Sequence, residues 1–142
     1  EEEQAYREYF ESIPENLSAY DEVDTYGHLD YIVRYGPNQN RFYSYEKYQD
    51  ILEAILKKLI EKNVGLEVNT GGYHYGLGEP NPCTAIICRY KELGGEIITI
   101  GADAHAPEKI GYDFDRAAQV LKECGFKYYT VFKDRKPNFV KL

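Results

Sequence analysis

The chain has 142 residues, enough for one domain with a buried core and too few for two comfortable ones. Its formal net charge of −7 argues against sequence-independent binding to a nucleic-acid backbone. No segment approaches the roughly eighteen continuous apolar residues of a membrane span, and no secretory signal opens the chain. The three cysteines form no even disulfide framework, and Cys88 and Cys124 fall on apolar helix faces where a thiol is usually a small core residue. We therefore expect a cytoplasmic protein with reduced thiols.

The first half of the chain is predicted to contain two helices and a strand. Residues 6–13 carry apolar side chains at helical spacing, and a short extended piece follows at residues 22–26. Ser44 can cap a helix that runs to about Asn63, with apolar positions recurring at the i, i+3, i+4 spacing of a core-facing helix. Residues 64–69 then form a strand.

Two further helices are predicted in the second half. Asn81–Pro82 opens the first, with asparagine as the cap and proline in the first turn, and Gly94–Gly95 closes it. Asp113 is predicted to cap the second helix, which ends at Gly125.

Two more strands complete the pattern, at residues 96–100 and 128–132, and residues 133–137 turn the chain into a final extended segment. Helices that alternate with short apolar strands over short connections imply parallel pairing with right-handed crossovers. The sequence therefore predicts α/β architecture, built as an open sheet or as a barrel.

Asp103 and His105 come directly after the predicted strand at residues 96–100. The carboxyl ends of parallel strands are where open α/β sheets and α/β barrels hold their catalytic residues. Imidazole nitrogen and carboxylate oxygen both suit zinc, iron and manganese, so the pair is a candidate metal site. The alternative is a histidine that donates a hydrogen bond to an aspartate within a turn.

The other two histidines map to the same edge of the predicted fold. His28 follows the first extended piece, and His74 lies in the long irregular stretch at residues 70–81, beyond Glu67 and Asn69 at the end of a strand. Long loops at the carboxyl ends of strands are where function concentrates. This edge is therefore the predicted functional site.

Three co-linear motifs resemble those of the polymerase-and-histidinol-phosphatase (PHP) superfamily. They are Gly-His-Leu-Asp-Tyr-Ile-Val-Arg-Tyr-Gly at residues 27–36, Leu-Glu-Val-Asn-Thr-Gly-Gly at 66–72, and Gly-Ala-Asp-Ala-His at 101–105. The extension Arg34-Tyr35-Gly36 and the ending at residues 127–142 are more similar to the histidinol-phosphate phosphatase branch. The likeness covers essentially the whole chain.

The resemblance implies an α/β fold, the C-terminal part of a distorted (β/α)7 PHP barrel with parallel strands. It also implies up to three divalent metal ions, zinc, manganese or iron, at the carboxyl ends of the strands. His28, Asp103 and His105 match metal ligands of the family, and Asp103 and His105 match catalytic positions. Clustered metals can bridge a hydroxide and hold a phosphate monoester for in-line attack. Glu67 is expected to support the ligands, because a carboxylate on a buried strand needs a partner.

Substrate contacts are expected from Arg34, Asn69 and His74. A guanidinium matches phosphate oxygens bidentately, so Arg34 is a candidate phosphate clamp. The alternative pairs Arg34 with Asp30 or Glu22 at the surface. Asn69 has an alternative role in an Asx turn that holds the following loop.

The chain also departs from the family pattern. The His-x-His motif of the family is absent, as are the middle His and Glu ligands, so residues 1–142 are expected to form a single PHP-type domain that is incomplete at its N-terminal side. The missing half of the barrel is an expected partner. Ala102 stands where serine is usual, and His74 stands where this branch often carries arginine.

The resemblance implies hydrolysis of a small phosphate ester, L-histidinol phosphate, to L-histidinol and phosphate in histidine biosynthesis, without nucleic-acid or membrane partners. One alternative is a PHP-type nuclease or nucleotide phosphatase. Another is a catalytically incomplete half-barrel that serves as a binding or structural module. We expect the isolated chain to be weak or inactive, because a multimetal site needs ligands on both sides of each ion.

Overall fold

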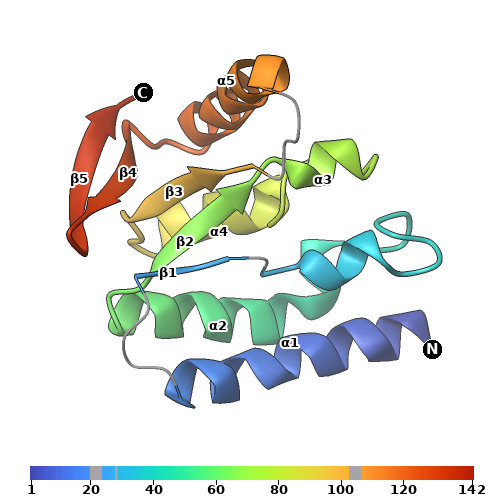
Figure 1. Cartoon of the computed structure of the whole chain (residues 1–142). Helices are drawn as coiled ribbons and strands as arrows, with labels where there is room; N and C mark the ends of the chain where they lie inside the picture. The colour runs from blue at the N-terminus through green and yellow to red at the C-terminus, as the bar shows by residue number, and fades with distance from the viewer. Residues whose placement is uncertain (20–23, 28, 103–106) are drawn as a thin grey trace.

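A computed structural model describes residues 1–19, 24–27, 29–102 and 107–142 of the chain. At its centre lies a parallel three-stranded sheet in the order β1-β2-β3, formed by β1 (Thr25–Tyr26), β2 (Gly65–Asn69) and β3 (Ile98–Gly101). The three strands point the same way, toward the right of Figure 1. The predicted α/β fold with parallel strands is therefore confirmed.

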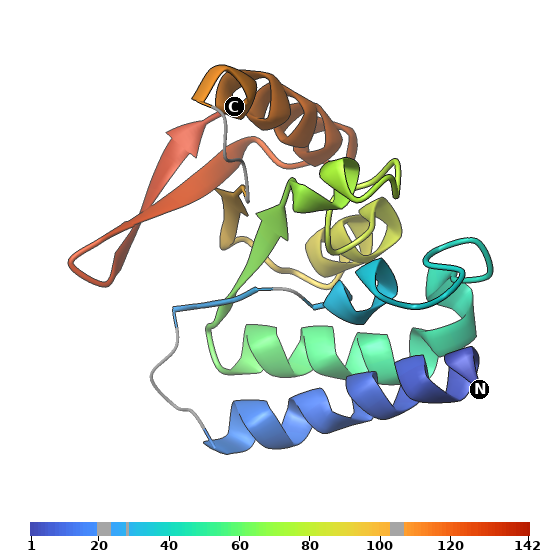
Figure 2. The same cartoon turned by 45° about the vertical axis from the view of Figure 1, so that its right-hand side comes forward.

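Four helices follow one another around the sheet: α1 (Glu2–Ala19), α2 (Gln49–Glu61), α4 (Thr84–Glu92) and α5 (Pro107–Glu123). α1 packs on α2, α2 on α4, and α4 on α5, so that the helices form one outer layer (Figures 1 and 2). None of the helices in the described part of the chain is long and apolar enough to cross a membrane.

The core lies between this helical layer and one face of the sheet. The apolar stripe of α2 is fully buried, and the β2 side chains Leu66 and Val68 point into the same core. Burying one such aliphatic side chain stabilises a protein by about 1.5–3 kcal/mol. Side chains with no exposed surface come from several elements, namely Phe10, Leu52, Ile55, Leu56, Leu59, Leu66, Val68, Ile86, Ile87, Ile98, Ala117 and Leu121.

Three short helical segments lie near the carboxyl ends of the strands or open the second long helix: η1 (Tyr31–Arg34), η2 (Tyr45–Tyr48) and α3 (Gly71–His74). The helix predicted from Ser44 begins as the 3-10 turn η2 and becomes α-helical at Gln49. Ser44 holds the cap position, but its side chain makes no capping hydrogen bond. The helix ends where predicted, since Asn63 adopts a left-handed conformation with φ of 59°.

A C-terminal hairpin pairs β4 (Tyr128–Lys133) with β5 (Lys136–Lys141) in antiparallel register. The strand and turn predicted there are confirmed, but β4 pairs with β5 and does not extend the parallel ladder. The hairpin is joined to the sheet where the Ile98 N–H of β3 donates to Thr130 Oγ1 of β4 at 3.2 Å.

The predicted start of a helix at Asn81–Pro82 is wrong, because α4 begins at Thr84. The backbone of Asn81 is already engaged with Asn69, with N–H to carbonyl distances of 2.7 and 2.9 Å in the two directions. The first amide of α4 is instead satisfied by a side chain, since Thr84 N–H donates to Glu79 Oε1 at 3.0 Å.

The predicted cap at Asp113 is also wrong, because α5 begins at Pro107 and Asp113 lies inside it. Proline is favoured at the first helical position, where its missing N–H leaves no hydrogen bond unmade. The Asp113 carboxylate is buried and contacts the His74 imidazole.

Cys88 in α4 and Cys124 just after α5 form a disulfide, with a Cα–Cα distance of 4.6 Å. The expectation that both are reduced core thiols is wrong. The separation of 36 positions hides the pairing in the sequence, because only the packing of α4 on α5 brings the two cysteines together. Cys83 remains a buried free thiol, and burial raises its pKa.

Candidate active site

The carboxyl ends of β1, β2 and β3 lie side by side, and we call this region the carboxyl edge. Gly27 directly follows β1 and Ala102 directly follows β3. The three predicted metal ligands lie outside the described residues: His28, Asp103 and His105. No group of three or more potential metal ligands occurs among the residues that are described. Convergence of the three side chains therefore stays a prediction.

Glu67 lies in the middle of β2, on the face opposite to the buried Leu66 and Val68. A Cβ atom on Gly27 would come 2.8 Å from its Oε1, and one on Gly101 would come 2.7 Å from its Oε2. Glycine on both neighbouring strands therefore makes room for this carboxylate. Within the described part of the chain, Glu67 makes no hydrogen bond or ion pair. A half-buried carboxylate so placed has the chemistry to support or bind a metal ion.

Arg34, at the end of η1, is buried at the carboxyl edge with only 3% of its surface exposed. Its Nε donates to Asn81 Oδ1 at 2.7 Å and its Nη2 donates to Asn69 Oδ1 at 3.1 Å. Its Cζ lies 4.4 Å from the ring centroid of Tyr31 and 4.8 Å from that of Tyr75. Amides and aromatic rings therefore hold the guanidinium in one orientation.

Asp30 is buried behind Arg34 and accepts three hydrogen bonds. Its Oδ1 accepts from Asn81 Nδ2 at 2.7 Å, and its Oδ2 accepts from the Cys83 N–H at 2.9 Å and from the Tyr43 hydroxyl at 3.1 Å. Burial raises the pKa of Asp30, and these hydrogen bonds oppose the rise. The Asn81 amide thus links Asp30 to Arg34. The alternative of a surface ion pair with Asp30 is wrong, because both side chains are buried, and Glu22 lies outside the described residues.

Asn69 holds the connection between β2 and α3. Its Oδ1 accepts from the Gly71 N–H at 2.8 Å, which is the Asx turn considered as its alternative role. The same oxygen accepts from Arg34, so Asn69 fixes both the loop and the guanidinium. A direct contact of Asn69 with substrate stays a prediction.

His74, at the end of α3, contacts Asp113 of α5, with 2.6 Å between Nε2 and Oδ2. The Asp113 side chain is nearly buried, whereas His74 is one-third exposed. The carboxylate therefore fixes the imidazole orientation and joins α3 to α5. Whether His74 meets substrate stays a prediction.

The sequence reasoning missed Asn81, Asp113 and Tyr31 as residues of the site, and it gave Tyr75 only a place as a residue that could line or cover a pocket. The acid at Asp113 lies within a strongly amphipathic helix, and a buried acid of this kind signals a partner on another element. For Tyr31 and Tyr75, which lie 44 positions apart, no comparable signal exists in the sequence.

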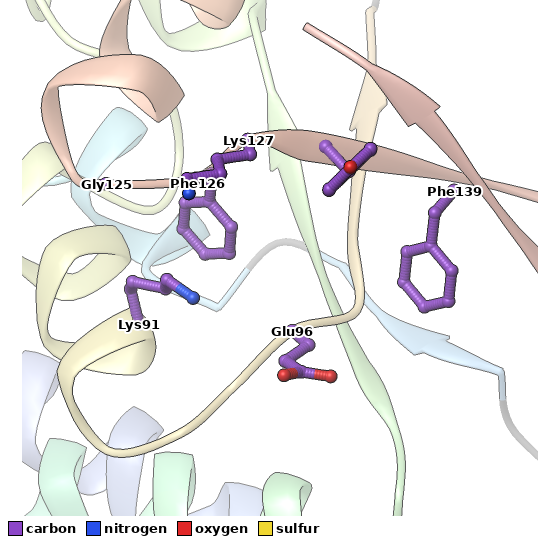
Figure 3. Close-up of a pocket in the computed structure, with 7 residues that line it drawn as sticks. Lys91, Glu96, Gly125, Phe126, Lys127 and Phe139 are labelled. Carbon is purple, nitrogen blue, oxygen red and sulfur yellow. The ribbon is translucent and has the colours of Figure 1, made fainter.

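A second feature, which we call the aromatic hollow, lies near the starts of β3 and β4, away from the carboxyl edge. It has a volume of about 540 Å³, and the rings of Phe126 and Phe139 flank it (Figure 3). Glu96 and Lys91 border it, and Lys91 Nζ lies 5.5 Å from the Phe126 ring centroid. None of the predicted site residues lines it.

A parallel sheet wrapped by successive helices, with buried polar side chains at the carboxyl ends of its strands, is the arrangement of α/β barrel enzymes. A family model described as PHP domain matches residues 1–71, half of the chain. The chain belongs to the PHP domain family.

Curated relatives carry the name histidinol-phosphatase. The protein from Lactococcus lactis is 31% identical over 134 residues, covering 94% of this chain and 49% of the relative. The probable histidinol-phosphatase of Thermotoga maritima is 36% identical over 107 residues, covering 75% of this chain and 43% of the relative. The probable histidinol-phosphatase of Clostridium acetobutylicum is 31% identical over 122 residues, covering 84% of this chain and 46% of the relative. The chain therefore spans about half the length of the curated relatives it matches.

A solved structure agrees with these relatives. The crystal structure of histidinol phosphate phosphatase from Lactococcus lactis, complexed with zinc, L-histidinol and phosphate, superposes with a TM-score of 0.82 at 27% identity. The match covers 97% of this chain and 52% of that one. The fold of this chain is therefore that of part of the histidinol phosphatase barrel.

Proposed function

We propose that this chain forms part of a metal-dependent phosphatase that hydrolyses L-histidinol phosphate to L-histidinol and phosphate in histidine biosynthesis. The observation that carries the proposal is the match of nearly the whole chain to a structure that holds zinc, L-histidinol and phosphate. The buried Arg34 at the carboxyl edge supports it, because a guanidinium held by neutral amides suits a phosphate dianion.

The residues of the carboxyl edge fit divalent metal ions. Glu67 presents a carboxylate between two glycines, without an ion-pair partner in the described part of the chain. We propose that His28, Asp103 and His105 bind the ions, with Glu67 supporting them. When bound, the ions lower the pKa of a water molecule and offset the charge of the phosphate.

We propose the following roles for the chain's own residues. Arg34 binds the phosphate oxygens and keeps the phosphorus in line with the attacking water. His74, oriented by Asp113, provides a second contact for the phosphate. Asp103 orients the water, and the ester P–O bond breaks as the new P–O bond forms. The proton that the water loses replaces phosphorus on the leaving oxygen, so that L-histidinol leaves as the alcohol.

We further propose that the remaining metal ligands come from the half of the barrel that this chain lacks. The chain spans about half of its relatives, and both outer strands of its sheet, β1 and β3, have a single ladder partner among the described strands. An open strand edge favours pairing with further strands. The alternative, a half-barrel that serves only as a binding module, predicts that restoring the other half brings no activity.

The test measures phosphate release from L-histidinol phosphate by the full-length parent protein with manganese or zinc. The Asp103→Asn variant should lose at least about 100-fold in kcat, because a neutral amide is a poor ligand. Asp134→Asn is the matched control, since Asp134 lies in the hairpin turn. Near-normal turnover by Asp103→Asn, with metal still required, would contradict the proposed role.

A further inference from the structure

We propose that Tyr31 and Tyr75 are positioning residues that clamp the Arg34 guanidinium for an incoming phosphate, with Tyr35 and Gln39 holding the clamp together. The assignment rests on the proposed function, because it makes Arg34 the phosphate receptor. It assigns roles to further residues, which act by positioning Arg34.

The two rings belong to different elements, and both contact Arg34. Tyr31 opens η1 and Tyr75 follows α3, and the Arg34 Cζ lies over both rings at 4.4 and 4.8 Å. A guanidinium over an aromatic ring is attracted by the negative ring face, and more strongly where water is excluded. Arg34 is itself buried, so the clamp acts on a desolvated cation.

Tyr35 ties the two walls of the clamp to each other. Its ring centroid lies 5.3 Å from that of Tyr31 and 5.7 Å from that of Tyr75. Its hydroxyl donates to the Tyr31 hydroxyl at 2.8 Å and lies 3.4 Å from the Tyr75 hydroxyl. These hydrogen bonds, that with Tyr31 first, raise the pKa of Tyr35, so its hydroxyl stays neutral.

Gln39 joins Arg34 to Tyr75 through their backbone carbonyl groups. Its Nε2 donates to the carbonyl oxygens of Arg34 and Tyr75, both at 3.1 Å. Its own carbonyl accepts from the Tyr6 hydroxyl of α1 at 2.9 Å. One side-chain amide therefore sets the distance between the residue that is clamped and one wall of the clamp.

The clamp limits how a phosphate can reach Arg34. The guanidinium lies over the two rings, and amides hold its Nε and one Nη. A phosphate that approaches in the plane of the guanidinium has the geometry of bidentate binding. Loss of one wall frees the side chain and weakens phosphate binding without changing the reacting groups.

The experiment compares Tyr75→Phe and Tyr75→Leu in the full-length parent protein. We expect the phenylalanine variant to keep the KM for the phosphate ester and the inhibition constant of inorganic phosphate within about twofold. The leucine variant should raise both by about fivefold to tenfold, while kcat stays within about twofold. Phe42→Leu is the matched control, because Phe42 is also an exposed ring, and its centroid lies 5.1 Å from the Cζ of another arginine, Arg41.

The outcomes separate this assignment from the proposed function. If phosphate inhibits the unsubstituted enzyme and Tyr75→Leu behaves like Phe42→Leu, the clamp is overturned and the function stands. If Tyr75→Leu lowers kcat and the melting temperature but leaves the phosphate inhibition constant unchanged, the ring has a structural role only and the clamp is again overturned. An unsubstituted protein that neither hydrolyses the ester nor binds phosphate would overturn the proposed function itself.

Discussion

The carboxyl edge and the aromatic hollow differ in how they are built. At the carboxyl edge the polar side chains are buried and bonded to one another, as in the chain of contacts from Asp30 through Asn81 to Arg34. The hollow is open, walled by phenylalanine rings and bordered by Lys91 and Glu96. Burying an arginine and an aspartate is costly unless each is bonded, so a protein keeps such a network where it has a use. The shape of the surface alone would suggest the hollow as the functional site, whereas the buried polar side chains indicate the carboxyl edge.

The largest expected effect tests whether the carboxyl edge is complete in this chain. We expect the purified 142-residue chain alone to hydrolyse L-histidinol phosphate more than about 1,000-fold more slowly than the same chain joined to the other half of the barrel. Several metal ligands are lost at once, and even one outer partner of a ligand is worth about 10- to 100-fold. Steady-state hydrolysis with manganese or zinc measures the ratio. Full activity of a monodisperse monomer of this chain would contradict the proposed half-site.

The next prediction contrasts one cation from each region. Arg34→Ala should lower kcat/KM by about 100-fold, because two charge-assisted hydrogen bonds to phosphate are lost at about 1.5 kcal/mol each. Lys91→Ala is the matched control, since Lys91 also lies beside an aromatic ring but at the hollow. A comparable loss in both variants would remove the functional distinction between the two regions.

The disulfide between Cys88 and Cys124 lies near the hollow and should act on stability. Closing a 36-residue loop restricts the unfolded chain by up to about 4 kcal/mol. We expect reduction to lower the melting temperature by about 10 °C at unchanged phosphate affinity. Calorimetry with and without reductant measures the shift, and the double variant Cys88→Ser, Cys124→Ser should be insensitive to reductant. A change in phosphate affinity on reduction would show that the two regions are coupled.

A smaller effect is expected from the contact between His74 and Asp113. Asp113→Asn removes the charge that orients the imidazole, and we expect KM for the phosphate ester to rise about fivefold, as for the loss of one hydrogen bond of about 1 kcal/mol. Asp115→Asn provides the control, because Asp115 is an exposed acid on the same helix. If both variants keep the original KM, His74 has no part in phosphate binding.

The smallest effect is expected at the contact of α2 with α4. Hydrogen bonding to Arg89 lowers the pKa of Glu53 to about 2. A carboxylate whose pKa is lower in the folded state stabilises the fold above its unfolded pKa, and this contribution is lost as the pH falls toward 2. Glu53→Gln should therefore reduce the loss of stability on acidification from about pH 4.5 to 2, as measured by denaturant unfolding. If the stability of Glu53→Gln fell with pH as steeply as that of the unsubstituted protein, the contact between Glu53 and Arg89 would not contribute to the acid dependence of stability.

The local elements and motifs of this protein can be predicted from its sequence alone. Helical spacing in residues 49–61 and the apolar strand at 65–69 produced α2 and β2, because each needs only one buried face. The motif around Arg34 indicated a cation at the carboxyl edge. The predicted ligands His28, Asp103 and His105 rest on the same kind of motif, and their convergence stays a prediction.

Which distant residues meet depends on how the helices and strands pack. Asn81 was expected to cap a helix, but its side chain joins Asp30 to Arg34 and its backbone is bonded to Asn69. Asp113 was expected to cap another helix and instead fixes His74 from inside α5. A short-range pattern records which side chains can cap a helix or be buried, whereas the side-chain contacts of Asn81 with Asp30 and Arg34, and of His74 with Asp113, span 39 to 51 positions and exist only once the helices pack. The carboxyl edge is therefore indicated by sequence motifs, and its geometry is set by packing.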